Sequence, residues 1–424
     1  MWALMRLMVI KTSVRQQITP SASWIRRLRA AVPTWIVLLY VALPAAGQVG
    51  DGAERALGPI EGPSEGPINL KLEPTEPWAA LEILGTAVEP GSKRRLVLRS
   101  SESFAGGYVE TPVVALRGTL PGPTLCLVAG IHGDEVNGVE IVRRTLQDES
   151  LLDTLEGSIV AVPIANLSAF QRGSRYLPDR RDLNRYFPGR TDGSSASRIA
   201  FRLFDNVIRK CDALVDLHTG SFHRTNIHQV RADMSNARTA ELANAYGAEI
   251  IVSNDGREGT LRRAATDSGI PAITVEAGEP ARFDEQLVRK SVKSISRLIF
   301  KLGMSSEASL WSRLASPSIT YWDTGWVRCN TGGILVSQVE LGETVELGQL
   351  LGTVSDPVSD EVDSIRARRA GRIIGMALDQ LVMPGFAAYH IASREPASAP
   401  ALPPMSTAET REEPEGIDLE ERPE

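Results

Sequence analysis

Residues 124–146 read TLCLVAGIHGDEVNGVEIVRRTL. The opening apolar run is bounded by Pro123 and Gly130, which predicts a buried strand. After it, apolar residues recur at the spacing of one helix face: Val139, Ile141, Val142 and Leu146. The sequence therefore predicts a strand over residues 124–129, a helix over residues 136–147, and His132 and Glu135 at the junction between them.

The polar residues at this junction are suited to holding a metal ion. If a helical turn has begun there, side chains three residues apart point the same way. His132 and Glu135 would then present an imidazole and a carboxylate together at the carboxyl end of a strand. By itself this spacing is more typical of a glycine turn with two solvated polar residues, so the interpretation depends on the rest of the chain.

A second histidine ends another predicted strand. His218 follows the apolar residues 213–217. With His132 and Glu135 it makes a set of two histidines and one carboxylate, typical of a zinc site that keeps its fourth position open for water. Asp216 points to the same face of the strand as His218, where it either orients that histidine or caps a neighbouring loop.

A carboxylate ends a third predicted strand. Glu276 follows residues 272–275 and precedes Ala277-Gly278. A carboxylate just outside the ligands of a zinc ion can take a proton from water and return it to a leaving nitrogen. The ordinary alternative is a surface glutamate in a turn.

A basic stretch lies between these strands. Residues 175–189 read RYLPDRRDLNRYFPG. A solvated run of charges is one interpretation of its arginines. Proline, glycine and aromatic residues interrupt the run and it lacks helical spacing, which favours a loop that presents guanidinium groups to a carboxylate.

Four motifs occur in order between residues 130 and 278: GxHGDE, DLNRxFPG, DLHTG and a strand that ends in Glu-x-Gly. Together they resemble the succinylglutamate desuccinylase and aspartoacylase family, a branch of the zinc carboxypeptidase fold. The resemblance implies that His132, Glu135 and His218 bind one zinc ion per subunit, and that Glu276 is the general base.

The same resemblance assigns roles in the basic stretch. It implies that Asn184 and Arg185 bind a carboxylate of the substrate and that Asp182 supports a histidine ligand. An upstream arginine of the family polarises the scissile carbonyl. We assign this role to Arg175, because Arg-Tyr precedes the DLNR motif, with Arg180 and Arg181 as the alternatives.

The wider pattern from residue 121 to residue 303 alternates between strands and helices. Strands are predicted at residues 124–129, 158–164, 213–217, 227–230, 249–252 and 272–275. Helices are predicted at residues 136–147, 197–209, 236–246, 260–268 and 283–302. This alternation predicts an α/β fold, with a mixed, largely parallel sheet and helices on both faces, as in zinc carboxypeptidases.

The chain changes character after residue 320. Residues 321–392 consist of short runs rich in glycine and valine, which predict a small all-β barrel. The barrel resembles a biotinyl or lipoyl carrier domain. Residues 352–373 contain no lysine, which disfavours attachment of a carrier group. We expect this domain to shape or cover the mouth of the active site.

The two ends of the chain have distinct compositions. Residues 1–47 combine a basic region, a short apolar core and small residues, which predicts a signal peptide or N-terminal anchor. We therefore expect export to the periplasm or the exterior. A membrane-anchored or cytoplasmic protein is the alternative, and membrane contact is expected only through residues 1–47 if they are uncleaved. Residues 48–78 are predicted to be a linker and residues 393–424 a disordered acidic tail.

These boundaries predict a catalytic domain over residues 79–303 and a connection over residues 304–320. The net charge of −6 comes largely from the acidic tail, so nothing in the composition suggests nucleic-acid binding. The three cysteines, Cys126, Cys211 and Cys329, are widely spaced in apolar surroundings. We expect them to act as small buried hydrophobic residues without a disulfide framework.

The sequence as a whole predicts a zinc-dependent hydrolase. Its expected substrate is a small molecule or short peptide that bears a carboxylate, and the expected reaction cleaves the amide bond of an N-acyl amino acid. A metallocarboxypeptidase that acts on short or cell-wall peptides is the main alternative. A non-catalytic binding protein with the same fold is a further one.

Overall fold

The computed structural model describes residues 80–102, 106–305, 317–378 and 380–394. The predicted signal segment (1–47) and linker (48–78) lie outside the described residues. So do most of the connection (304–320) and nearly all of the acidic tail. Among the described helices, none has the length and apolar content needed to cross a bilayer.

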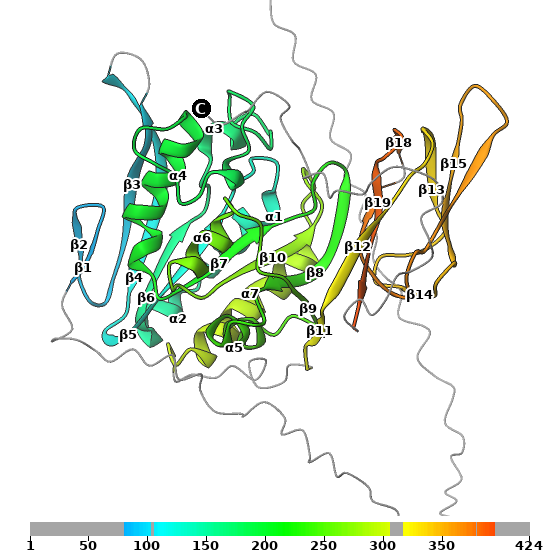
Figure 1. Cartoon of the computed structure of the whole chain (residues 1–424). Coiled ribbons are helices and arrows are strands. Elements are labelled where there is room, and N and C mark those ends of the chain that lie inside the picture. Colours follow the sequence, from blue (N-terminus) through cyan, green and yellow to red (C-terminus); the bar gives the residue numbers. More distant parts are fainter. Residues whose placement is uncertain (1–79, 103–105, 306–316, 379, 395–424) are drawn as a thin grey trace, which may run out of the picture. The chain divides into compact units, whose positions relative to one another are not determined.

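A large mixed sheet organises the described residues (Figure 1). Its main path runs β12-β19-β17-β8-β10-β7-β5-β6-β4-β3, with β9, β11 and β14 paired off this path. The strands are β3 (Ser92–Glu102), β4 (Tyr108–Arg117), β5 (Leu120–Ala129), β6 (Glu156–Val162), β7 (Ala213–His218), β8 (Arg224–Ala232), β9 (Ile250–Ser253), β10 (Ala272–Gly278), β11 (Ile319–Tyr321), β12 (Asp323–Arg328), β14 (Thr344–Val345), β17 (Gly371–Ala377) and β19 (Ala387–Ser393).

The sheet is parallel only in part. β10, β7, β5 and β6 are parallel neighbours, as are β8, β9 and β11. The remaining pairings are antiparallel, including β3 with β4 and β8 with β10. The prediction of a mixed sheet is therefore confirmed, but the parallel part of the sheet is smaller than predicted. It missed that β8 follows β7 after a short loop and that the C-terminal strands join the same sheet.

Helices cover both faces of this sheet. The helices are α1 (Val136–Leu146), α2 (Glu149–Thr154), α3 (Leu167–Phe170), α4 (Ser195–Asn206), α5 (Ala237–Tyr246), α6 (Leu261–Asp267) and α7 (Glu285–Lys301), with short 3-10 turns η2 (Leu183–Arg185) and η3 (Ile208–Lys210). Alternate residues of β5 enter two cores, Leu125 and Leu127 on one side and Cys126 and Val128 on the other. Buried residues of α1, α5 and α7 complete the first core, and those of α4 and α6 the second. The mixed α/β prediction is confirmed.

Side-chain caps fix where most of the longer helices begin. Ser194, Asn236, Thr260 and Asp284 each accept a hydrogen bond from a backbone N–H in the first turn of α4, α5, α6 and α7 respectively. These caps lie within a few residues of the predicted helix starts. α1 differs, because Glu135 at its N-cap position makes no capping hydrogen bond.

The C-terminal strands do not form a separate barrel. β12, β17 and β19 extend the large sheet, because β17 pairs with β8. The other strands form a four-stranded sheet: β13 (Gly333–Ser337), β15 (Leu350–Ser355), β16 (Val362–Arg366) and β18 (Leu381–Val382). The two sheets share one apolar core, and among the described residues no strand pairing joins them. The prediction of a β-rich C-terminal region is confirmed in part, but its strands do not form a separate barrel. Short apolar runs reveal strands but not their partners.

A disulfide joins two of the three cysteines. Cys126 in β5 is bonded to Cys211, two residues before β7, and Cys329 is free and buried. The expectation of three unpaired cysteines was therefore wrong. Sequence spacing could not show the pair, because the two residues are 85 positions apart and approach only when β5 and β7 become neighbours.

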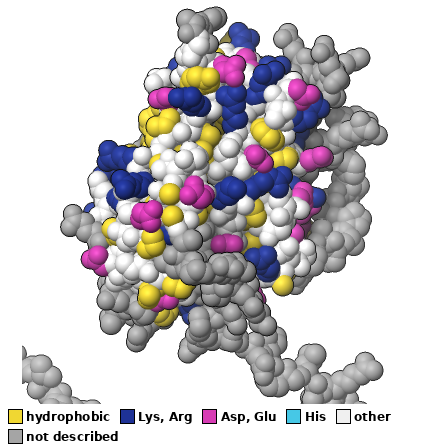
Figure 2. Space-filling model, turned by 90° about the vertical axis from the view of Figure 1, so that its left-hand side faces the viewer, with side chains coloured by type: hydrophobic (Ala, Val, Ile, Leu, Met, Phe, Trp, Pro, Cys, Tyr) yellow, Lys and Arg dark blue, Asp and Glu magenta, His cyan; other side chains and the backbone are white. Residues whose placement is uncertain are grey.

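The far edge of the large sheet is strongly charged. β3 is the edge strand, and its exposed residues include Lys93, Arg94, Arg95 and Arg99. Figure 2 looks onto this side of the molecule, where lysine and arginine side chains stand among acidic and apolar ones. Charged side chains on an edge strand discourage pairing with another chain. A small hairpin of β1 (Leu81–Ile83) and β2 (Thr86–Val88) also lies on this side (Figure 1).

Candidate active site

Three strands carry the candidate site at or just beyond their carboxyl ends. β5 leads into residues 130–135, β7 ends at His218, and β10 contains Glu276 near its end. β5, β7 and β10 are parallel neighbours, so these ends meet at one edge of the sheet. The structure thus brings together the three places that the sequence predicted separately.

The loop after β5 is held tightly against the segment around α3. A Cβ atom on Gly133 would lie 2.0 Å from the backbone carbon of Ala169, so only glycine fits there. Glu135 precedes the first turn of α1 and has non-helical backbone angles. Helix α1 begins at Val136, as predicted, so no helical turn spans residues 132–135. The compact loop, not a helical turn, brings His132 and Glu135 together.

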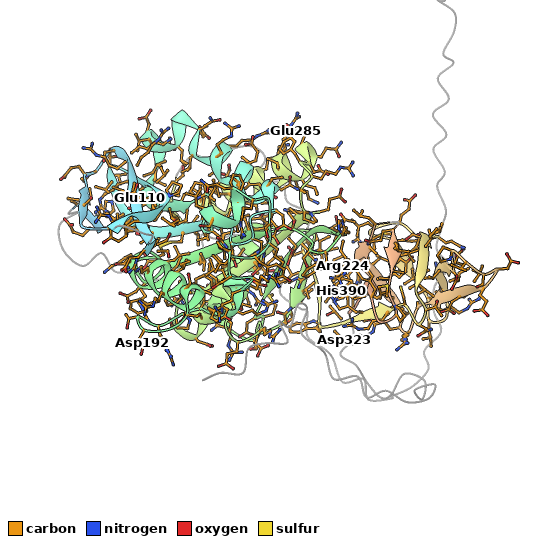
Figure 3. All side chains as sticks on the ribbon, turned by 90° about the horizontal axis from the view of Figure 1, so that it is seen from above. Glu110, Asp192, Arg224, Glu285, Asp323 and His390 are labelled. Carbon is orange, nitrogen blue, oxygen red and sulfur yellow. A yellow bond between two sulfur atoms is a disulfide. The ribbon has the colours of Figure 1, made fainter. Side chains whose placement is uncertain are left out.

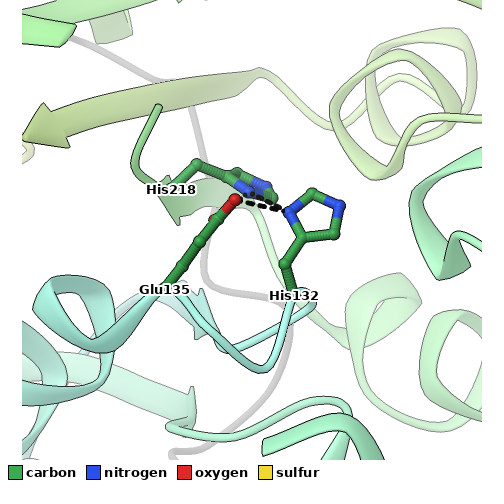
Figure 4. A group of neighbouring side chains, drawn as sticks. All are labelled: His132, Glu135 and His218. Atoms are coloured by element: carbon green, nitrogen blue, oxygen red, sulfur yellow. Dashed lines mark hydrogen bonds and ion pairs between the residues drawn. The ribbon is translucent and has the colours of Figure 1, made fainter. Parts of the chain in front are cut away.

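His132, Glu135 and His218 form a compact buried cluster (Figure 4). Nδ1 of His132 is 2.7 Å from one carboxylate oxygen of Glu135, and Nδ1 of His218 is 2.8 Å from the other. The two Nδ1 atoms are 3.2 Å apart. Both imidazoles therefore direct the same ring nitrogen toward one point beside the carboxylate.

A second carboxylate faces the outer nitrogen of each imidazole. Nε2 of His132 is 3.0 Å from Oδ1 of Asp182, and Nε2 of His218 is 3.0 Å from Oδ2 of Asp216. Burial and Arg175 lower the pKa of His132, but Glu135 and Asp182 raise it by more. Burial likewise lowers the pKa of His218, and Asp216 with Glu135 raises it well above its usual value.

These surroundings fit a divalent cation. Both imidazoles lie where positive charge is stabilised. Burial alone would raise the pKa of Glu135, but the two histidines outweigh it and hold that pKa well below its usual range. The potential ligand atoms lie within 4.8 Å of one another. Two imidazole nitrogens and one carboxylate oxygen, each imidazole backed by another carboxylate, are a donor set that suits zinc.

Glu276 lies beside the cluster but outside it. Its backbone is directly opposite His218 on the neighbouring parallel strand. Oε2 of Glu276 accepts a hydrogen bond of 3.0 Å from Nδ2 of Asn226, and Oε1 lies 3.4 Å from Nε of Arg231. The side chain lines a cleft and is not a solvated turn residue. Its predicted role as a base requires a carboxylate that lies beside the cluster without being part of it.

Among the candidate arginines, Arg175 is the one that reaches the cluster. Its NH1 lies 3.4 Å from Glu135 and 3.3 Å from Nδ1 of His132, and its NH2 donates to Asp182 at 3.0 Å. Arg180 is exposed, Arg181 pairs with Asp179 at 3.1 Å, and neither lines the cleft. The geometry therefore favours Arg175 over both alternatives for the predicted contact with a carbonyl oxygen.

Asn184 and Arg185 lie in η2 and line the same cleft. The side-chain oxygen of Asn184 accepts a hydrogen bond from the backbone N–H of Leu261. The side-chain NH2 group of Asn184 is not used in this contact. Asp182 caps η2 by accepting from the N–H of Asn184. The motif thus uses Asp182 twice, to hold His132 and to fix the turn that carries the two predicted carboxylate-binding residues.

The cleft around these residues has a volume of about 660 Å³ and a basic lining. Seven arginines line it: Arg175, Arg185, Arg224, Arg231, Arg257, Arg262 and Arg328. The acidic residues of the lining are Glu135, Asp255 and Glu276. The excess of positive charge attracts anionic ligands and raises their local concentration.

The C-terminal strands supply one wall of the cleft, which the sequence did not reveal. Trp326 of β12 and His390 of β19 line it, with ring centroids 4.5 Å apart and nearly parallel planes. Figure 3 shows His390 and Arg224 close together where the C-terminal strands meet β8. His390 lies on the last described strand of the chain. Its place in the cleft depends on the pairing of β19 with β17, for which the sequence carries no signal.

Arg262 is a buried cation in this lining. Its side chain is about 5% exposed, and it donates to the backbone and side-chain oxygens of Asn254. Among the described residues no carboxylate lies within ion-pair distance of it. Burial and the nearby Arg231 lower its pKa to about 10. The more distant carboxylates of Asp216, Asp255 and Asp233 offset part of this lowering of the pKa. The guanidinium lines the cleft.

Known proteins similar to this chain include deacylases. Residues 121–301 match the family model of the succinylglutamate desuccinylase/aspartoacylase catalytic domain. The chain is 27% identical over 290 residues to N-alpha-acetyl-L-2,4-diaminobutyric acid deacetylase from Halomonas elongata, covering 64% of this chain and 82% of that protein. It is 36% identical over 200 residues to a succinylglutamate desuccinylase from Pseudomonas fluorescens, covering 46% of this chain and 55% of that protein.

The fold also occurs in solved structures. A succinylglutamate desuccinylase/aspartoacylase from Rhodobacter sphaeroides superposes with a TM-score of 0.64 at 23% identity, covering 71% of this chain and 95% of that one. At this identity the likeness concerns the fold alone. The motifs and the family model agree that residues 121–301 of this chain belong to the succinylglutamate desuccinylase/aspartoacylase family.

Proposed function

We propose that this protein is a zinc-dependent hydrolase that cleaves the amide bond of an N-acyl amino acid or a similar substrate bearing a carboxylate. The observation that carries the proposal is the buried His132, Glu135 and His218 cluster with the separate carboxylate of Glu276 opposite His218. The relatives named as deacylases support the same reaction class.

The residues that would hold the zinc ion are His132 and His218, through Nδ1, and Glu135, through its carboxylate. A zinc ion bound there would lower the pKa of a water molecule and polarise the scissile carbonyl. Asp182 and Asp216 keep the two imidazoles oriented by facing their Nε2 atoms.

The protein's own groups supply the proton transfers and the charge stabilisation. Glu276 accepts a proton from the attacking water and returns it to the leaving nitrogen. Arg175, which already lies beside His132 and Glu135, is placed to donate to the carbonyl oxygen as negative charge develops on it. The low exposure of these side chains strengthens both effects.

The basic lining supports an acidic substrate. Asn184 and Arg185 are proposed to bind one carboxylate. Arg262, which has no carboxylate partner among the described residues, together with Arg231 would favour a second anionic group. The deacetylase from Halomonas elongata is named for a diaminobutyric acid derivative. The arginines of this cleft argue against such an amine-bearing substrate here.

The runner-up function is a metallocarboxypeptidase. A cleft of about 660 Å³ has room for more than a small acyl amino acid, so a short peptide also fits it. A non-catalytic binding protein would need neither Glu276 nor a zinc ion.

We also propose that the protein is exported. The basic and apolar pattern of residues 1–47 motivates this proposal, and the disulfide between Cys126 and Cys211 supports it, because such bonds persist in oxidising compartments. Thiol labelling of cell fractions, with and without prior reduction, tests it. Free Cys126 and Cys211 in a cytoplasmic fraction would contradict it.

The functional proposal is tested by a substrate screen on the full-length chain with its metal content measured in parallel. N-acyl amino acids with one or two carboxylates are compared with short peptides that have free C-termini. Hydrolysis of the acidic N-acyl amino acids supports the deacylase. Hydrolysis confined to peptides supports the carboxypeptidase, and no zinc with no hydrolysis supports the binding protein.

A further inference from the structure

Neighbouring strands connect the His132, Glu135 and His218 cluster to the C-terminal strands, with one shift of register between β10 and β8. His218 of β7 is opposite Glu276 of β10. On the next strand, Asn226 of β8 lies near the end of β10, opposite Gly278, and on its other side it is opposite Gly375 of β17. Gly375 is in turn opposite His390 of β19. Asn226 thus lies between β10 and the C-terminal strand β17.

Asn226 contacts the proposed base directly. The residue is about 4% exposed, and its Nδ2 donates to Oε2 of Glu276 at 3.0 Å. Arg231 lies 3.4 Å from the other carboxylate oxygen. A glutamate side chain has several rotatable bonds and loses more than 1 kcal/mol of rotamer freedom when fixed. A neutral amide holds the carboxylate through a hydrogen bond without adding a charge beside it.

The position of the Asn226 amide depends on a glycine in the C-terminal strands. A Cβ atom on Gly375 would lie 2.5 Å from Oδ1 of Asn226, too close for any side chain to share that space. A larger residue at this position would push the amide away from Gly375 and change its approach to Glu276. The glycine in β17 therefore leaves the space that the Asn226 side chain occupies.

We propose that Asn226 is a positioning residue for Glu276, and that the C-terminal strands act on catalysis through it by way of Gly375. This inference rests on the proposed function, in which Glu276 is the general base. A purely structural role for Asn226 would require only that a side chain of the same size and shape fill this space.

The isosteric variant Asn226→Asp separates the two roles. It keeps the shape but replaces the donor with a carboxylate that faces Glu276. In the full-length enzyme we expect kcat to fall about 10- to 100-fold, with KM and zinc content within about twofold of wild type. The pH profile of kcat should also shift to higher pH, as expected for two adjacent carboxylates. Wild-type kcat with an unchanged pH profile would overturn the proposal.

Gly375→Ala tests the second half of the inference. We expect it to lower kcat in the same way, because the new methyl group displaces the amide. Gly352→Ala is the control for a loss of stability, since a Cβ atom there would crowd the Tyr389 hydroxyl and the backbone oxygen of Val336, away from Asn226. Equal effects of the two variants on kcat would show that Gly375 acts only through stability.

Crystal structures of the wild type and of Asn226→Ala test the contact without any substrate. We expect the carboxylate of Glu276 to sit against the amide in the wild type and to change rotamer in the variant. The same carboxylate position in both would overturn the proposal. If the wild type hydrolyses no amide, the proposed function fails, and these structures still decide whether Asn226 positions Glu276.

Discussion

Glu276 lies directly opposite His218 on the adjacent parallel strand of the sheet. The spacing between the proposed base and a proposed zinc ligand is therefore set by strand register and not by a flexible loop. Registers in a buried parallel sheet are strongly specified, because a slip of one residue turns every side chain to the opposite face. A site of this kind requires little ordering when substrate binds.

The predicted carboxylate contact can be tested at Arg185. Arg185→Met should raise KM for an acidic N-acyl amino acid about 10- to 100-fold, the scale expected for loss of a charge-assisted hydrogen bond. Steady-state kinetics give the value, with kcat much less affected. Arg181→Met serves as the control, because Arg181 lies outside the cleft and pairs with Asp179. Equal KM values for wild type and Arg185→Met would remove this contact from the account.

Replacing the buried Arg262 should weaken substrate binding without lowering the free energy of unfolding. Arg262→Leu removes a guanidinium that has no carboxylate partner in the described part of the chain. We expect KM for substrates with two anionic groups to rise about tenfold, while substrates with one are little affected. The free energy of unfolding should stay the same or increase. A loss of stability with unchanged KM would mean that the arginine serves the fold.

The neutral, buried His228 predicts a stability change with pH away from the site. Burial and Lys290 lower its folded pKa from 6.5 to about 3. Its contribution is therefore complete above pH 6.5 and is lost as the pH falls toward 3. Between pH 7 and pH 4.5, metal-free wild type should lose about 2.5 kcal/mol more unfolding free energy than His228→Gln. Urea unfolding at both pH values gives the comparison, and equal losses would show that His228 is accessible to protons.

The disulfide predicts a redox-dependent stability. Reduction of Cys126 and Cys211 should lower the free energy of unfolding by about 4 kcal/mol, given the long loop that the bond closes. Denaturant unfolding with and without reductant measures the difference. Cys329→Ala should show the same difference, because Cys329 is not bonded. Free thiols at both positions by mass spectrometry of the unreduced protein would contradict the bond.

The sequence predicted the centre of the catalytic segment well, for local reasons. Gly130 ends β5 as predicted, although the strand starts at Leu120 and so includes Pro123. Side-chain caps such as Thr260 and Asp284 lie at the predicted helix starts. His132 and His218 could be singled out because each follows an apolar strand. Parallel strands then bring their carboxyl ends together without further information.

The features that were missed depend on contacts between distant parts of the chain. His390 enters the cleft only because β19 pairs with β17, and β17 with β8. Arg262 was not distinguishable from other basic residues at a helix start until its burial was known. Asn226 lies in a strand whose antiparallel return beside β10 no local pattern indicates. Strand pairing is set by the whole fold, so a single stretch of sequence does not show which strands pair.

The central claim is that Glu276 transfers protons beside a zinc ion that it does not bind. The most direct test measures zinc content and turnover of the best substrate for the full-length wild type and Glu276→Gln. The account predicts one zinc per chain in both proteins, with kcat reduced by at least about 100-fold in the variant. Zinc lost from the variant, or turnover that remains at the wild-type level, would contradict it.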